Sequence, residues 1–149
     1  MSTPFQSHVE SLRTGSANAI TSTAAELANL ALANDGYRVA IREAGAIGPL
    51  LSLAAGTPAY MAPEQWDEEG LTAKTDVYAF GVMLNEMEMR TRPWQGVGNM
   101  MAIGHKVCQG DRPPVASGAV GQLVARCWAA EPAARPTMEQ AMRELAQLA

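Results

Sequence analysis

The chain lacks the long hydrophobic runs and the dense basic clusters that mark several classes of protein. No apolar run approaches the roughly 18 residues that a membrane-spanning helix requires. Residues 1–20 have neither a basic start nor an apolar core, so we expect no signal peptide. No basic patch reaches the density that attracts nucleic acid or an anionic membrane. We therefore expect no nucleic-acid partner, no membrane partner and a cytoplasmic location.

Cysteine is scarce too, with 2 among 149 residues. The spacing of Cys108 and Cys127 matches neither a zinc site nor a disulfide framework, so we expect reduced thiols. What is present is a globular composition, 48% hydrophobic and 17% charged, with a mild net charge of −4. This length suits one domain or two incomplete ones, with room for one modest core.

The first part of the chain has a helical pattern. We expect residues 1–20 to form a flexible N-terminal segment because they are mostly polar and small. Thr23 and Glu26 then form a predicted capping box, which opens a helix that ends near Asn34. Two further helices are predicted over residues 37–44 and 46–55, with Pro49 tolerated in a first turn.

Residues 21–55 resemble an armadillo-type repeat. The resemblance rests on residues 25–31 and 41–51, most specifically on Glu43-Ala44-Gly45-Ala46-Ile47. An Ala/Leu-rich helical hairpin of another kind is the alternative interpretation. Solenoid repeats need about three neighbours to bury their apolar faces, so we expect a single unit to leave such faces exposed.

The second part of the chain begins with a loop rich in glycine, proline and acidic residues and continues with four predicted helices. Thr75-Asp76 open the first helix, which runs to about Met89 with apolar residues at helical spacing. The next two cover 99–109 and 119–128, and a capping box of Thr137 and Gln140 opens the last. We expect Met138, Ala141, Met142, Leu145 and Leu148 to point inward from that last helix. No segment has a convincing strand pattern, so the predicted fold class is all-α.

Four blocks of residues occur in one order along this second part. They are Gly56-Thr57 with Tyr60-Met61-Ala62-Pro63-Glu64, then Thr75-Asp76-Val77-Tyr78-Ala79-Phe80-Gly81-Val82, then Arg92-Pro93-Trp94, and finally Cys127-Trp128 with Glu131-Pro132 and Arg135-Pro136-Thr137. In this order they resemble the end of a protein-kinase catalytic domain. We therefore predict an armadillo-like hairpin over 21–55, followed at 56–149 by the helical C-lobe portion of a protein kinase fold.

The resemblance implies roles for particular residues. It pairs Glu64 with Arg135 in a buried ion pair, and it makes Asp76 the cap of a central helix. Trp128 is expected in the core and Trp94 in a loop between helices. Gly56, Thr57 and Tyr60 are expected to line a substrate groove.

The same resemblance distinguishes between kinase groups. Thr57 and the residues up to Met61 resemble Ser/Thr kinases, in which the residue at the position of Thr57 helps to select a hydroxyl acceptor. Cys127-Trp128 and Arg135-Pro136-Thr137 favour the tyrosine-kinase-like group of Ser/Thr kinases. The family uses ATP and magnesium.

The parts that position ATP and magnesium in this family have no counterpart in the chain. A Gly-rich loop, a strand lysine, a His-Arg-Asp loop and an Asp-Phe-Gly motif are all missing. Residues 39–42 imitate the lysine motif within a helical pattern, while Ala79-Phe80-Gly81 lacks the carboxylate and Gly96-Val97-Gly98 lacks the third glycine. We therefore predict no catalytic, cofactor-binding or metal-binding residue in this chain.

Three other features carry no predicted chemistry. His8 and His105 have no recognisable catalytic partner in sequence, and we expect His105 on a helix surface. The acidic residues Glu64 and 67–69 match no calcium loop, so we interpret them as a solvated face.

Taken together, these features indicate a protein kinase domain-containing protein that is truncated and inactive as this chain. Two alternatives stay open: a non-catalytic interaction module, which would bind a protein partner or self-associate, and an incomplete gene product.

Overall fold

A computed structural model of the protein describes residues 7–8, 10–11, 57–67 and 72–148. The chain divides into two compact units, Met1–Leu53 and Ala54–Ala149. Gly56 and the helices predicted between Thr23 and residue 55 lie outside the described residues, so the armadillo-like repeat stays a prediction. Across the described ranges the regular elements are helices and none is a strand, which agrees with the predicted all-α class.

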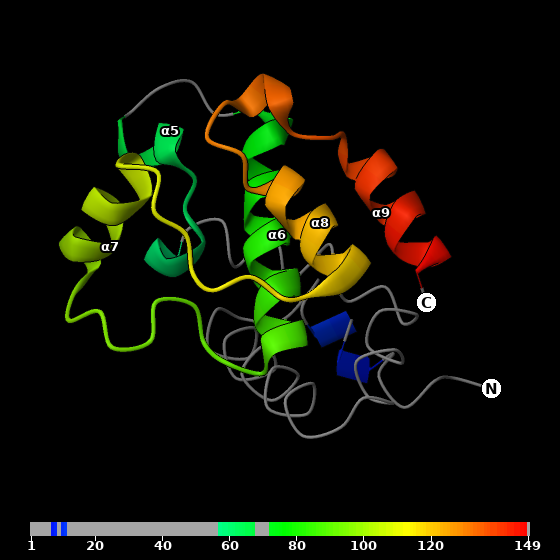
Figure 1. Ribbon diagram of the computed structural model, residues 1–149, viewed down its shortest axis with the longest axis horizontal. Helices are drawn as coiled ribbons and strands as arrows, with labels where there is room; N and C mark the ends of the chain where they lie inside the picture. The colour runs from blue at the N-terminus through cyan, green and yellow to red at the C-terminus, as the bar shows by residue number, and fades with distance from the viewer. Residues whose placement is uncertain (1–6, 9, 12–56, 68–71, 149) are drawn as a thin grey trace. The chain divides into compact units, whose positions relative to one another are not determined.

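The helix α6, Ala73–Met89, is the centre of the second unit (Figure 1). Thr75 and the continuous stretch 77–85 are buried, so the helix is enclosed on all sides rather than along one stripe. The helix begins two residues earlier than the sequence predicts, because the Thr72 side chain accepts a hydrogen bond from the Lys74 amide and thereby caps it. The expectation that Asp76 caps this helix is therefore wrong; Asp76 lies in its first turn and is exposed.

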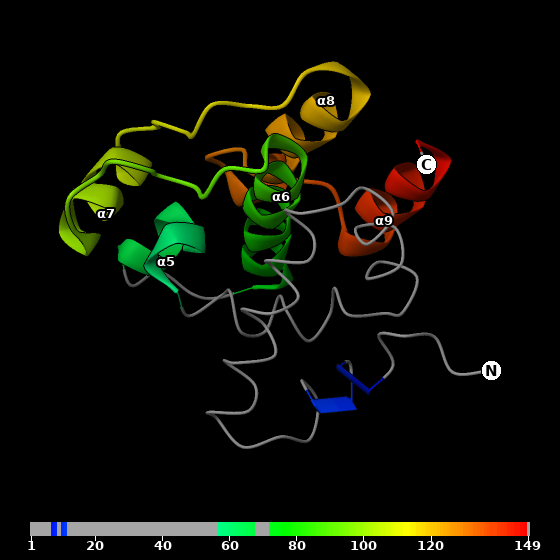
Figure 2. The ribbon, with the colours of Figure 1, turned by 90° about the horizontal axis from the view of Figure 1, so that it is seen from below.

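Two helices from the end of the chain pack on α6, namely α8, Gly118–Cys127, and α9, Met138–Gln147 (Figures 1 and 2). The backbones of α6 and α8 approach closely, since a Cβ atom on Gly81 would lie 2.7 Å from the Cβ atom of Cys127. The predicted capping box of Thr137 and Gln140 opens α9. Leu148 was expected inside but is 40% exposed, because α9 ends at Gln147 and the chain leaves the core there.

A second cluster of elements consists of η1, Pro58–Tyr60, α5, Pro63–Trp66, and α7, Met100–Cys108. The sequence predicted only a loop over 57–67, yet Pro58 and Pro63 each preset the first residue of a short helical turn. The helix α7 begins after the cap Asn99 and packs on α5, where a Cβ atom on Gly104 would lie 2.5 Å from the Trp66 ring.

The links between these helices are also held in place. The amide side chain of Asn85 donates to the Pro114 carbonyl at 2.8 Å and accepts from the Ala116 amide at 2.8 Å, which fixes the link from α7 to α8 on the central helix. A short 3-10 turn, η2, Pro132–Ala134, delivers Arg135 from α8 toward the start of α9. No helix among the described residues is both long and apolar enough to cross a membrane.

Candidate functional site

Residues 57–67 form a chain segment that lies on α6 and α7 through its two short helical turns. The Tyr60 amide donates to the Thr57 carbonyl at 2.9 Å, so Thr57 and Tyr60 stand at the two ends of the η1 turn. Thr57 is exposed in an extended conformation, whereas Tyr60 is half-buried. The segment therefore presents one end to solvent and anchors the other.

The anchor is a buried ion pair between Glu64 of α5 and Arg135 after η2. The Arg135 Nη1 and Nη2 atoms donate to the two carboxylate oxygens of Glu64 at 2.6 and 2.9 Å. The side chain of Arg135 is 0% exposed and that of Glu64 is 5% exposed, so the interpretation of Glu64 as part of a solvated acidic face is wrong. A two-pronged guanidinium–carboxylate contact of this kind is both strong and geometrically specific.

Every N–H group of the Arg135 guanidinium, five in all, has an acceptor. Besides the two bonds to Glu64, three donate to backbone carbonyls, those of Ala129, Lys74 and Ala130, at 2.8, 3.0 and 3.0 Å. In the opposite direction, Lys74 Nζ donates to the Arg135 carbonyl. A fully satisfied guanidinium joins the segment 57–67, the start of α6 and the end of α8 at one point.

Hydrogen bonds determine the charge state of this pair. Burial alone would raise the pKa of Glu64, but the hydrogen bonds and charge of Arg135, with a further bond from the Thr75 hydroxyl at 3.2 Å, bring it below its ordinary value of 4.5. Glu64 is thus held as a carboxylate.

The Tyr78 ring contacts two guanidinium groups, one of which is that of Arg135 in the ion pair. The centre of that ring is 5.1 Å from the Cζ atom of Arg135 and 5.2 Å from that of Arg112, which are cation–π distances. Burial raises the pKa of the Tyr78 hydroxyl to about 12, against the opposing effect of both arginines. The ring therefore stays neutral while it contacts both cations.

A second link ties the segment to α6. The Tyr60 hydroxyl donates to the Glu86 carboxylate at 2.5 Å. Burial raises the pKa of Glu86, while the Tyr60 bond and the charge of Arg92 oppose the rise. Burial also raises the pKa of Tyr60, and Glu86 adds to that rise. Glu86 thus ties the half-buried end of η1 to the central helix.

The other residues singled out in the sequence have structural positions. Trp128 is 5% exposed at the end of α8, and Trp94 lies in the loop between α6 and α7. His105 is on the exposed face of α7. Cys108 is exposed and Cys127 is buried, where burial raises the thiol pKa of Cys127 to about 12.

The residues that imitate the magnesium motif do not fit a metal. Ala79 has no carboxylate, and Ala79, Phe80 and Gly81 are all buried within α6. In the part of the chain that the structure describes, no group of three or more His, Cys, Asp and Glu side chains converges. What the described residues can do is hold the segment 57–67 in a fixed position, with Thr57 exposed at one end.

Sequence reasoning missed the partners that complete the site, namely Lys74, Thr75 and Glu86. Glu86 carried a usable signal, because it is an acidic residue between Met83, Leu84 and Met87 on a strongly apolar helix. Such a carboxylate needs a hydrogen-bond donor, and the half-buried Tyr60 supplies it. The residue pattern gave no indication of the contacts that Lys74 and Thr75 make.

Comparison with known proteins places the chain among the kinases. Residues 52–145 match the family model for protein tyrosine and serine/threonine kinases. The chain is 30% identical over 117 residues to mitogen-activated protein kinase kinase kinase 7 of Drosophila melanogaster, which covers 74% of this chain and 17% of that protein. It is 37% identical over 84 residues to the serine/threonine/tyrosine-protein kinase HT1 of Arabidopsis thaliana, covering 54% of this chain and 22% of the relative.

The matched region contains both links of the anchored segment, since Glu64, Arg135, Tyr60 and Glu86 all lie within residues 52–145. The chain spans about a fifth of the length of these two relatives, 17% and 22%. On this match, the chain belongs to the protein kinase family.

Proposed function

We propose that residues 57–148 are the helical, substrate-binding portion of a protein kinase that phosphorylates serine or threonine. The observation that carries the proposal is the buried contact between Glu64 and Arg135, which anchors the segment 57–67 while Thr57 stays exposed. Thr57 and Tyr60 then face the substrate; Gly56, the third residue expected to line the groove, lies outside the described residues. The names of the relatives, which include serine/threonine kinases, support this choice of acceptor.

We propose that these 149 residues do not transfer phosphate unaided. We assign phosphate transfer to a complete kinase domain with ATP and magnesium. The signature motifs for nucleotide and metal are missing from the sequence, and Ala79-Phe80-Gly81 is enclosed in α6. Phosphoryl transfer depends on positioning and on charge stabilisation by the groups that these motifs supply.

Isothermal titration calorimetry of the 149-residue protein with ATP and magnesium tests this second part. We expect no measurable heat of binding, and an affinity in the micromolar range would overturn it. The substrate-binding part is tested separately, by probing an array of serine- and threonine-containing peptides with the labelled protein.

We expect Thr57→Glu to abolish the array signal, because it places a charge at the exposed end of η1. The matched control is Glu139→Gln on α9, whose carboxylate is exposed and outside the segment. A signal that survives Thr57→Glu, or one that Glu139→Gln removes equally, would argue against peptide binding at this segment.

We also propose that α7 binds a protein partner or a second copy of this chain. We propose a cytoplasmic location for the protein. Met100 and Met101 in the first turn of α7 are 52% and 71% exposed, and large exposed apolar side chains of this kind favour association. Sedimentation velocity of the wild type and of Met101→Gln tests self-association. A monomer at all concentrations for the wild type would eliminate it.

A further inference from the structure

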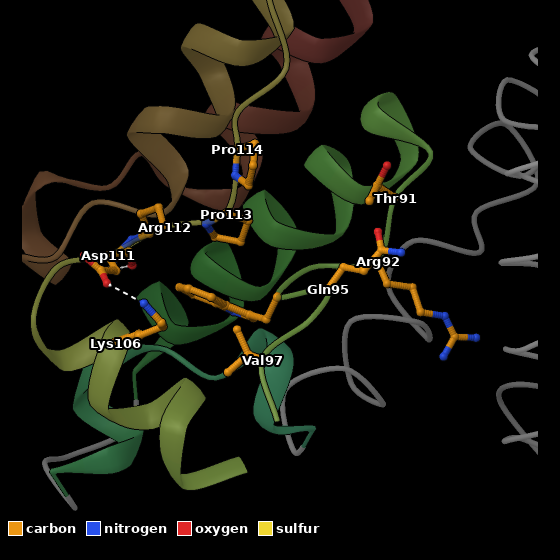
Figure 3. Close-up of a pocket in the computed structure, with 10 residues that line it drawn as sticks. Thr91, Arg92, Gln95, Val97, Lys106, Asp111, Arg112, Pro113 and Pro114 are labelled. Carbon is orange, nitrogen blue, oxygen red and sulfur yellow. Dashed lines mark hydrogen bonds and ion pairs between the residues drawn. The ribbon is translucent and has the colours of Figure 1, made fainter. Parts of the chain in front are cut away.

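An open groove lies beside the loop that follows α6, at some distance in sequence from the segment 57–67. It encloses about 460 Å³ and is formed by three pieces of chain, the loop 91–97, Lys106 of α7 and the link 111–114 (Figure 3). A groove of this size can hold several residues of an extended peptide. All three pieces belong to the second unit of the chain.

The lining of the groove includes apolar side chains. Pro113 is buried, and Trp94 and Val97 are half-buried. Trp94 has a φ angle of 60°, in the left-handed region that bulky side chains rarely adopt. Strained residues of this kind are concentrated at ligand sites, where the surrounding structure holds them in place.

Positive charge predominates around the groove, although the chain as a whole has a net charge of −4. Three cationic side chains, Arg92, Lys106 and Arg112, line it together with one carboxylate, Asp111. Lys106 Nζ lies 3.2 Å from the Asp111 carboxylate, and both side chains are about half exposed, at 45% and 52%.

The cations are fixed at separate places. Arg112 donates to the Trp128 and Val107 carbonyls at 2.9 and 3.2 Å, which holds its charge at one wall. In Figure 3 Arg92 stands at the opposite end of the groove from the Lys106–Asp111 pair, and its side chain extends outward from that end. Arg92 is exposed, and its charge also acts on Glu86.

We propose that this groove docks an extended acidic segment of another protein, with an apolar residue against Trp94 and Pro113 and carboxylates toward Arg92 and Lys106. Charge complementarity argues for an acidic occupant. The separation of the cations argues for a peptide rather than a single small anion, which would need donors that converge on one point. Neither Thr57 nor Tyr60 lines the groove, although the charge of Arg92 at its end also acts on Tyr60 and Glu86. The proposal does not depend on phosphate transfer.

Fluorescence anisotropy of the full 149-residue protein tests the proposal. The probe is a fluorescein-labelled peptide in which a leucine–proline–leucine centre has a pair of glutamates on each side. Its control probe has lysines in place of the glutamates. We expect the acidic probe to bind at least about tenfold more tightly than the basic one, and its binding to weaken as salt rises.

Two charge reversals locate the binding. We expect Lys106→Glu and Arg92→Glu each to weaken the acidic probe about tenfold, and Arg143→Glu to leave its affinity unchanged because Arg143 lies on the exposed face of α9. Circular dichroism melts of each variant check that it is folded. The two reversals are independent because they change opposite ends of the groove.

Three results would overturn the proposal. They are equal binding of the acidic and basic probes, equal loss in Arg143→Glu, and displacement of the acidic probe by inorganic phosphate at equal concentration, which would indicate a small-anion site instead.

Discussion

Arg135 and Glu64, 71 residues apart in sequence, meet through two short hydrogen bonds of 2.6 and 2.9 Å in the interior of the protein. Every other N–H of that guanidinium reaches a backbone carbonyl. Both side chains are buried, so water cannot take the place of a missing partner. The contact therefore holds the segment 57–67 on the helical core only while both residues are present.

The first prediction concerns the removal of one partner. We expect Glu64→Ala or Arg135→Ala to lower the free energy of unfolding by about 3–5 kcal/mol, because the remaining charge stays buried without a counter-charge. Urea titrations followed by circular dichroism measure the loss. The matched control is Arg143→Ala, since the Arg143–Glu139 pair on α9 is exposed and is worth at most about 0.5 kcal/mol. Equal losses at both pairs would contradict the buried pair.

The second prediction concerns the pH dependence of this pair. Glu64 has a pKa below 4.5 in the folded protein, so folding favours its carboxylate form. Its contribution to stability is therefore fully present above pH 4.5 and disappears as the pH falls through the folded pKa. We expect the stability difference between the wild type and Glu64→Gln to shrink steadily in acid, measured by urea titrations from neutral pH downward. A difference that grows in acid would reverse the sign and refute it.

The third prediction concerns Glu86, whose pKa is raised rather than lowered. Folding then favours the protonated form, and stability is lost as the pH rises through the raised pKa. We expect Glu86→Gln to be neutral or stabilising at neutral pH and equal to the wild type in acid. The glutamine oxygen still accepts from the Tyr60 hydroxyl.

Thermal melts at neutral and acid pH measure this effect. The control is Glu139→Gln, which removes the same charge from an exposed position and should change stability little at either pH. A marked loss of stability in Glu86→Gln at neutral pH alone would mean that Arg92 stabilises an ionised Glu86.

The fourth prediction concerns the contact between α5 and α7. A Cβ atom on Gly104 would lie 2.5 Å from the Trp66 ring, so Gly104→Ala forces the ring or the helix to move. We expect a loss of about 1–3 kcal/mol, typical of overpacking, in spite of the better helix propensity of alanine. Gly98→Ala is the control, because nothing lies within 4 Å of its Cβ position. Denaturant titrations measure the unfolding midpoint of each variant. Equal midpoints for Gly104→Ala and Gly98→Ala would contradict the close contact.

Much of the helical architecture could be predicted from the residues alone. The apolar spacing along 75–89 and the capping box of Thr137 with Gln140 are local signals, and the helices α6 and α9 form where they indicate. The start of α6 could not be located in the same way. Thr72 and Thr75 both have side chains that can cap, and the choice between them depends on Thr75 being turned inward to Glu64.

The family and the helical class follow from the residues alone, because four ordered blocks and periodic apolar residues are properties of the chain and need no partners. Which polar groups meet depends on how the helices pack. Glu86 accepts a hydrogen bond from Tyr60, the Tyr78 ring contacts both Arg112 and Arg135, and Lys106 and Arg92 come to opposite ends of one groove. These contacts join residues far apart in sequence, and their strength depends on burial and direction, which arise only when the helices pack.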